Sequence, residues 1–148
     1  MSAPDIRSFE AAIDRMIGKV KADGTAVFRG TCNVVTENIV AGGQYGPGTP
    51  VDTGFARDSW TPGLNGEGAY RQPSEHAHGA APAGEDPSVV GGIVGELNLG
   101  DIYYCTSNCA YQRALDYGHS GQAPNGHVRL VMDQLPAIVA EQVREHAA

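Results

Sequence analysis

The residues best suited to bind a metal ion fall in two short clusters. Glu75, His76 and His78 bring together a carboxylate and two imidazoles, and Cys105 and Cys109 lie four positions apart. Structural zinc is usually held by four such side chains in a tetrahedron. The histidine cluster lies in a Gly- and Pro-rich stretch without a second ligand pair, and the two cysteines supply half a site. We therefore expect no metal and no cofactor.

A second candidate for chemistry is the triplet Asp52-Thr53-Gly54. Aspartic proteases use this triplet, and in them two copies of the Asp share one proton. There the Asp is flanked by apolar strands, whereas here Gly-Thr-Pro-Val precedes it and Arg57 and Asp58 follow. This setting favours a structural interpretation in which the Asp52 carboxylate is the N-cap of a short helix. A homodimeric aspartic protease is the enzymatic alternative.

Other catalytic patterns lack their usual context. The Gly-rich stretch 42–48 has no Lys followed by Ser or Thr, which a phosphate-binding loop requires. No Ser, His and Asp set shows a local context such as a nucleophile elbow. We therefore expect the protein not to be an enzyme.

The charge balance argues against a nucleic-acid-binding module. The chain has 10 Lys and Arg against 17 Asp and Glu, a net charge of −7, and its basic residues are scattered. Proteins that bind nucleic acid present clustered basic side chains to phosphate. An acidic surface can instead line a channel through which DNA slides without sticking.

Length and composition indicate one domain over residues 1–148 with a long irregular segment, because 20 Gly and 9 Pro are many for a chain of this size. The odd number of cysteines, Cys32, Cys105 and Cys109, predicts free thiols in a reducing cytoplasm. The first residues do not resemble a signal peptide, and no apolar run reaches the length of a membrane span.

A long N-terminal helix over residues 5–41 is the strongest secondary-structure prediction, because apolar residues recur at steps of three, four and seven. At a rise of 1.5 Å per residue this helix would be about 55 Å long, more than such a domain needs. Gly24 allows a break, and Gly42 signals the end. The apolar stripe consists of Phe9, Ile13, Met16, Ile17, Val20, Val27, Phe28, Val34, Val35 and Ile39.

The remaining patterns predict an α+β fold, in which the long N-terminal helix and a C-terminal helix pack on a small, mainly antiparallel sheet. Pro136 either kinks the C-terminal helix or marks its first turn. Up to residue 100, the predicted elements are a turn and short helix at 50–60, a strand beginning at Trp60 and reaching Leu64, a flexible loop at 62–88, and a helix that opens at Asp86-Pro87 and stops at Gly100. Residues 101–146 are predicted to contain a strand at 102–106, a helical turn at 111–117 closed by Gly118, and the C-terminal helix at 127–146.

Three ordered stretches carry a resemblance to a known family. They are Thr49 to Gly54 with Arg57 and Ser59-Trp60, then Gly100 to Tyr104 with Thr106 to Asn108, then Tyr111, Leu115 to Ser120 and Gln122 to Gly126 leading into Val128 to Leu130. Together they resemble the neck or tail-completion proteins of long-tailed bacteriophages, over residues 5 to 145. Each stretch alone is a weak signal, and their order and spacing make the set specific. Cys105 and Cys109 depart from the family pattern.

The resemblance implies a non-enzymatic virion subunit, made in the host cytoplasm and located at the head–tail junction. Copies would form a ring, with a hexamer expected and a twelvefold ring as the alternative, through which DNA passes. The ring would contact head-side connector proteins and tail terminator or tube proteins, and the loop 62–88 would order against a neighbour. A small acidic protein-binding module is a further alternative. Structural or interface roles are expected for Pro50, Asp52, Gly54, Arg57, Trp60, Tyr111, Asp116, Tyr117 and Gly118.

Overall fold

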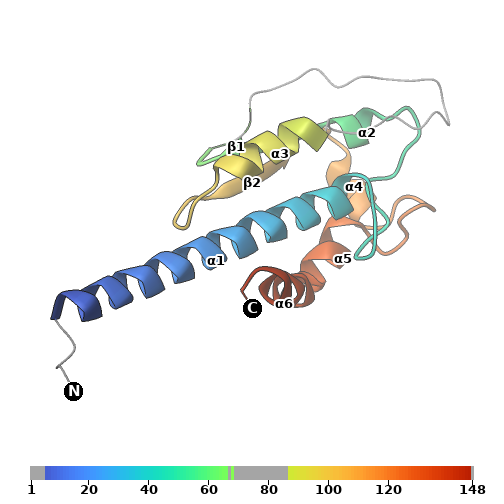
Figure 1. Cartoon of the computed structure of the whole chain (residues 1–148). Helices are drawn as coiled ribbons and strands as arrows, with labels where there is room; N and C mark the ends of the chain where they lie inside the picture. Colours follow the sequence, from blue (N-terminus) through green and yellow to red (C-terminus); the bar gives the residue numbers. More distant parts are fainter. Residues whose placement is uncertain (1–5, 67, 69–86, 148) are drawn as a thin grey trace.

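The computed structural model describes residues 6–66, 68 and 87–147 (Figure 1). The predicted cluster Glu75, His76 and His78 and most of the predicted loop 62–88 lie outside these residues. In chain order the helices and strands are α1 (Ile6–Val40), α2 (Phe55–Asp58), β1 (Trp60–Leu64), α3 (Pro87–Glu96), β2 (Tyr103–Ser107), α4 (Gln112–Asp116), α5 (Val128–Asp133) and α6 (Leu135–His146).

Helix α1 is the axis of the molecule and confirms the prediction of one long N-terminal helix. Its 35 residues span about 52 Å at the usual rise. Gly24 does not break it, and a Cβ there would lie 3.1 Å from Leu99 Cδ1, so this glycine lets the loop after α3 approach the helix closely. The N-terminal half of α1 projects beyond the other elements (Figure 1).

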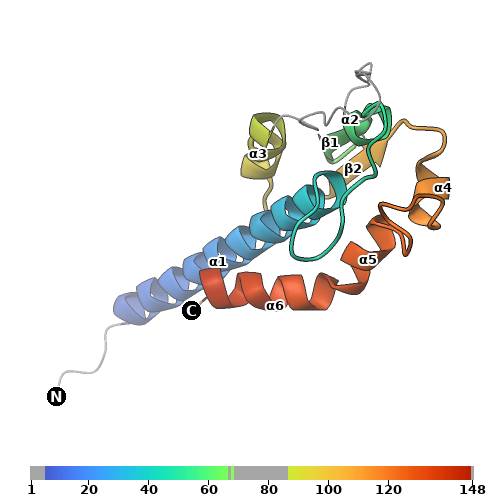
Figure 2. The ribbon, with the colours of Figure 1, turned by 90° about the vertical axis from the view of Figure 1, so that its right-hand side faces the viewer.

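The sheet has two antiparallel strands, which confirms the predicted α+β class. β1 pairs with β2 from Trp60↔Ser107 to Leu64↔Tyr103. Helix α3 and this sheet lie on one side of the C-terminal half of α1, and α5 and α6 lie on the other (Figure 2). The two layers therefore pack on different faces of the long helix, and they meet at its C-terminal end, where Trp60 of β1 and Val131 of α5 belong to one cluster.

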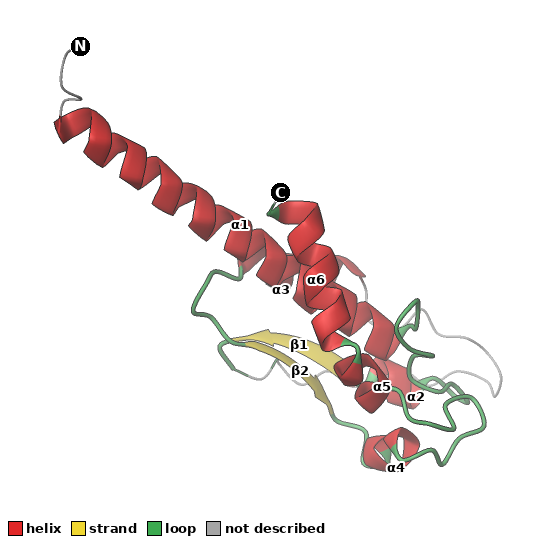
Figure 3. Cartoon of the chain, turned by 90° about the horizontal axis from the view of Figure 1, so that it is seen from below, coloured by secondary structure: helices red, strands yellow, loops and turns green. Residues whose placement is uncertain are grey.

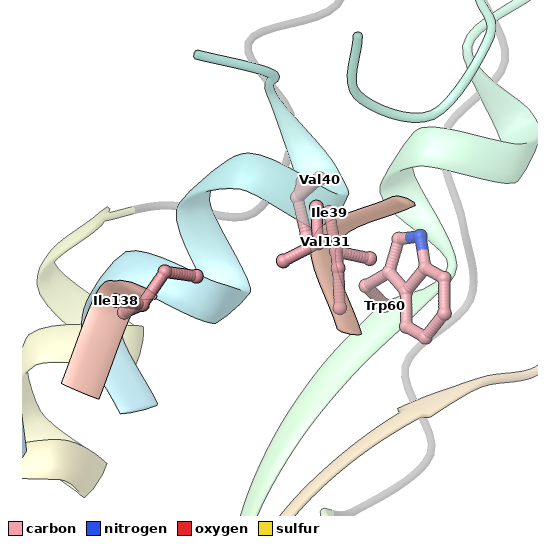
Figure 4. Close-up of a cluster of buried hydrophobic side chains, with 5 residues drawn as sticks. All are labelled: Ile39, Val40, Trp60, Val131 and Ile138. Atoms are coloured by element: carbon pink, nitrogen blue, oxygen red, sulfur yellow. The ribbon is translucent and has the colours of Figure 1, made fainter. Parts of the chain in front are cut away.

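One hydrophobic cluster joins the end of α1 to β1 and the C-terminal helices. Ile39, Val40, Trp60, Val131 and Ile138 are all buried and pack together (Figure 4). Because these residues come from four elements, this cluster fixes how the chain returns to α1 after the sheet.

A second cluster holds α3 and the sheet against α1. Cys32, Val94 and Leu97 are buried there, with Leu64 and Tyr103 packed on them. Burial raises the pKa of the Cys32 thiol to about 11, so this thiol stays protonated near neutral pH. Cys32, Cys105 and Cys109 are free thiols.

The predicted helix at 127–146 is two helices, with α5 ending at Asp133 and α6 beginning at Leu135. Pro136 occupies the first turn of α6, so the first-turn alternative is confirmed. The physical reason is that a proline inside a helix clashes with the carbonyl four residues earlier and donates no hydrogen bond.

Other boundaries also differ from the predictions. Residues 62–64 of the predicted loop belong to β1, and its last two residues belong to α3. Helix α3 ends at Glu96 rather than at Gly100, because Arg29 Nε binds the Leu97 carbonyl at 2.7 Å and Asp101 accepts from the Asn98 amide at 2.7 Å. The second strand begins one residue later than predicted, at Tyr103.

Helix α6 runs along α1 and ends part-way along it (Figure 3). The two helices approach closely at Gly30, where a Cβ would lie 1.8 Å from Gln142 Oε1 and 3.4 Å from His146 Nε2. The end of α6 therefore lies beside Gly30, and the part of α1 before residue 23 extends past it. None of the described helices is long and apolar enough to cross a membrane.

Candidate functional site

The first and third family-like stretches meet at a pocket. The Gln122 side chain pairs with the backbone of Val51, accepting from its amide at 2.9 Å and donating to its carbonyl at 2.7 Å. The rings of Phe55 and Tyr111 lie 6.3 Å apart. A pocket of about 300 Å³ lies between the two stretches and is lined by Pro50, Val51, Asp52, Thr53, Gly54, Phe55, Ala56, Tyr111, Leu115, His119, Ser120 and Gln122.

Asp52 is exposed at this pocket and is not the N-cap of α2. That position belongs to Gly54, whose φ of 88° lies in the left-handed region that glycine tolerates best. The prediction of Asp52 as N-cap is therefore wrong, although the predicted short helix exists. The triplet lies between a loop and a four-residue helix and does not follow a strand.

Trp60 and Arg57 both bind Thr49. The indole Nε1 of Trp60 donates to Thr49 Oγ1 at 2.8 Å, and Thr49 Oγ1 donates to the Ile39 carbonyl at 2.8 Å. Arg57 donates from Nε and Nη2 to the Thr49 carbonyl at 3.2 and 3.0 Å. The structure thus links the predicted residues through the fully buried Thr49, for which no role was predicted. These contacts anchor the loop to the end of α1.

Asp116 is the residue that caps a helix. Its Oδ1 accepts hydrogen bonds from the backbone amides of His127, Val128 and Arg129, at 3.0, 2.8 and 3.1 Å. These amides begin α5 and would otherwise lack helical partners. A carboxylate at this end also opposes the positive pole of the helix dipole. The cap comes from α4, so helix-start patterns within 127–133 could not reveal it.

The segment after Asp116 is held by a cation and a glycine. The Arg129 guanidinium lies 4.5 Å from the centre of the Tyr117 ring and donates to the Asp116 carbonyl at 2.6 Å. Gly118 has a φ of 87°, and a Cβ there would lie 2.3 Å from the Pro124 carbonyl oxygen. Tyr117 is 57% exposed, so its ring also presents a surface.

His127 is a buried polar residue that the sequence did not single out. Its Nε2 lies 2.6 Å from Gln112 Nε2, and its ring packs edge-on to Trp60 at 6.4 Å. Burial lowers the pKa of His127, and the nearby Asp116 carboxylate opposes this shift. The folded protein therefore favours a neutral imidazole here.

No group of three or more His, Cys, Asp and Glu side chains that could hold a metal occurs in the described part of the chain. Cys109 is buried and Cys105 is partly buried.

The chain matches no protein-family model, no curated protein and no solved structure.

A second candidate site is the projecting part of α1, residues 6–22, which we call the arm. Every residue of the arm except Ile13 is exposed. Its apolar side chains are exposed to an unusual degree: Ile6 73%, Phe9 63%, Met16 59%, Ile17 45% and Val20 64%. The periodicity predicted this stripe, but the fold uses only its continuation after residue 23. Contiguous exposed apolar surface of this kind is typical of a protein interface.

A third candidate site is an exposed apolar surface on α6. Pro136, Val139, Ala140 and Val143 are exposed, with Val139 at 37% and Val143 at 44%. Their spacing of three, four and seven places them on one side of the helix, which we call the outer face of α6. Helix-period reasoning predicted Val139 and Val143 as part of a single apolar side, together with Ile138. The structure buries Ile138 and leaves the two valines exposed.

Proposed function

We propose that the protein is a structural subunit of a tailed-phage virion that forms a ring at the head–tail junction, through which DNA passes. Its partners are copies of itself, head-side connector proteins, and tail terminator or tube proteins. The resemblance over residues 5 to 145 supports this assignment, and so does the way the first and third stretches meet in space.

The exposed arm is the observation that carries the proposal. Fully burying one large apolar side chain contributes about 1.5–3 kcal/mol relative to leaving it in water. The arm exposes five such side chains on one stretch of helix. Leaving this stripe in water therefore forgoes several kcal/mol, which contact with another chain would recover. An assembly subunit has this property, and a self-contained monomeric enzyme has no need of it.

The roles of the motif residues also support a structural protein. Trp60, Arg57 and Asp116 make contacts that organise the fold, through Thr49 and the first amides of α5. The charge adds a second argument, because a net charge of −7 per copy would repel DNA from the wall of a shared channel.

The test is the mass and shape of the purified full-length chain. Native mass spectrometry combined with negative-stain electron microscopy should show a closed ring, with six copies as the expected number. A protein that stays monomeric or dimeric at every concentration would contradict the proposal. Pepstatin-sensitive cleavage of casein by the pure protein would favour the aspartic protease instead.

A further inference from the structure

The arm and the outer face of α6 are two different exposed apolar surfaces on the same chain. We infer that the arm of one copy packs against the outer face of α6 on the next copy, and that repetition of this contact closes the ring. The closure of a ring rests on the proposed function. The contact itself rests on the exposure, spacing, size and charge of the two surfaces.

The arm has the pattern of a helix that packs against another helix. Ile6, Ile13 and Val20 recur every seven residues, and Phe9 and Met16 form a second row with the same interval. A repeat of 3.5 residues per turn is typical of helix–helix packing. The charged residues beside the stripe favour a protein rather than a membrane surface as the partner of the arm, because a helix that lies on a membrane surface has a mainly basic polar face. Here the polar residues carry both signs: Arg7, Arg15, Lys19 and Lys21 are basic, and Glu10, Asp14 and, just after the arm, Asp23 are acidic.

The outer face of α6 complements the arm in size. Ile138 and Gln142 of α6 are buried, while the adjoining side of the helix presents small or short apolar groups such as Val139 and Ala140. A helix that is apolar on two sides is typically covered on both. Large side chains of the arm opposite small ones of α6 would let the two helix axes approach closely.

Charge favours contact between an arm and a body, by which we mean the chain outside residues 6–22. The arm contains four basic and two acidic side chains, so it carries +2 of a total of −7, which leaves −9 for the body. Bodies repel one another, whereas an arm is attracted to a neighbouring body. At physiological salt this electrostatic attraction extends over only about 8 Å. It therefore favours arm–body contacts over body–body contacts, and it adds little to the stability of the contact once formed.

The contact must form between copies. The arm continues without a break from the part of α1 against which the inner side of α6 packs. Because α1 is one continuous helix that extends past the end of α6, a chain cannot fold its own arm back onto the outer face of its own α6 (Figure 3). A contact between two different surfaces repeats head to tail and closes into a ring when the rotation allows. Pairing of arm with arm would instead stop at a dimer and leave α6 uncovered.

The arm can be tested without disturbing the fold, because its side chains are exposed. The double variant Phe9→Glu with Met16→Glu places two carboxylates on the apolar stripe. The matched control Ala11→Glu with Gly18→Glu adds the same charge on the opposite side, where Gly18 has no neighbour within 4 Å. We expect the stripe variant to be a monomer with native-like circular dichroism and a cooperative thermal transition, at a midpoint below that of the assembled chain because the stabilisation by assembly is lost. We expect the control to assemble like the original chain.

A second variant tests the outer face of α6. Val139→Glu with Val143→Glu should also give a folded monomer. Each variant keeps the surface that the other has lost, so an equimolar mixture should form a one-to-one dimer through a single intact contact. Sedimentation of each variant and of the mixture, with mass labelling of one partner, measures this.

The outcomes separate this inference from the proposed ring. A ring that persists in the stripe variant would overturn the inference and leave the proposed function standing. Two monomeric variants whose mixture gives no dimer would show that the surfaces do not meet, with the same consequence. An original chain that is monomeric would overturn both. Flotation of the original chain, but not of the stripe variant, with vesicles of equal phosphatidylcholine and phosphatidylglycerol would assign the arm to a membrane and overturn the inference.

Discussion

At the scale of single residues, the contacts that hold the fold together join distant parts of the chain. Trp60 is the clearest case, because it is buried in the main cluster and donates to Thr49. Trp60→Ala should lower the free energy of unfolding by about 3–5 kcal/mol through lost packing. Trp60→Phe keeps an aromatic ring and should cost less, about 1–2 kcal/mol, mainly through the lost hydrogen bond.

Urea unfolding monitored by circular dichroism measures both values. Ile102→Ala is the control, since this side chain is 58% exposed and its loss should change stability by no more than about 0.5 kcal/mol. Equal effects of Trp60→Ala and Ile102→Ala would show that Trp60 is not part of a stabilising core.

His127 predicts a pH dependence with a definite sign. Its pKa is lowered in the folded state, whereas in the unfolded chain it lies near 6.5. Below about pH 6.5 the unfolded chain therefore binds a proton that the folded protein refuses, and stability falls as the pH is lowered. It continues to fall until the pH reaches the folded pKa.

Thermal midpoints of the original chain and of His127→Gln between pH 7.5 and 5 test this prediction. The variant should be less stable at pH 7.5 but should lose less stability on acidification. Parallel curves for the two proteins would contradict the assignment of the slope to His127.

At the scale of elements, α5 depends on a cap that comes from outside its own segment. Asp116→Ala removes the acceptor of three backbone amides and should destabilise the protein by about 1–2 kcal/mol. Asp116→Asn keeps an acceptor without the charge and should cost less. Asp133→Ala, at the other end of α5, should have little effect or a slightly favourable one, because an acid there opposes the helix dipole. Urea unfolding of the three variants orders them, and similar losses for Asp116→Ala and Asp133→Ala would contradict the capping role.

The elements that sequence reasoning predicted best are those defined by local pattern. The stripe from Phe9 to Ile39 predicted α1 within one residue at each end, and Pro136 correctly offered a first turn for α6. The failures concern contacts between distant positions. Asp52 has the residue type and position expected of an N-cap, but the N-cap of α2 is the left-handed Gly54. The carboxylate that caps α5 belongs to Asp116, which lies eleven residues before the N-cap residue His127. The roles of Thr49 and His127 follow from their contacts with Trp60, which only the three-dimensional structure shows.

At the scale of the whole molecule, the account depends on what covers the arm. Because its five large side chains are 45–73% exposed, completing their burial would contribute about 5–9 kcal/mol. Loss of translational and rotational freedom on association costs about 4–15 kcal/mol, so one contact alone gives weak to moderate affinity. Closing a ring adds a further contact with no second loss of that kind, which favours closed rings over open chains.

The most direct measurement is the native mass of the full-length chain beside that of the Phe9→Glu and Met16→Glu double variant. We predict a closed ring for the original chain, and for the variant a monomer with native-like circular dichroism whose cooperative thermal transition lies below that of the ring. The Ala11→Glu and Gly18→Glu control should give the mass of the original ring. An original chain that remains monomeric, with its apolar arm exposed at every concentration, would contradict the central claim that this protein functions by assembly.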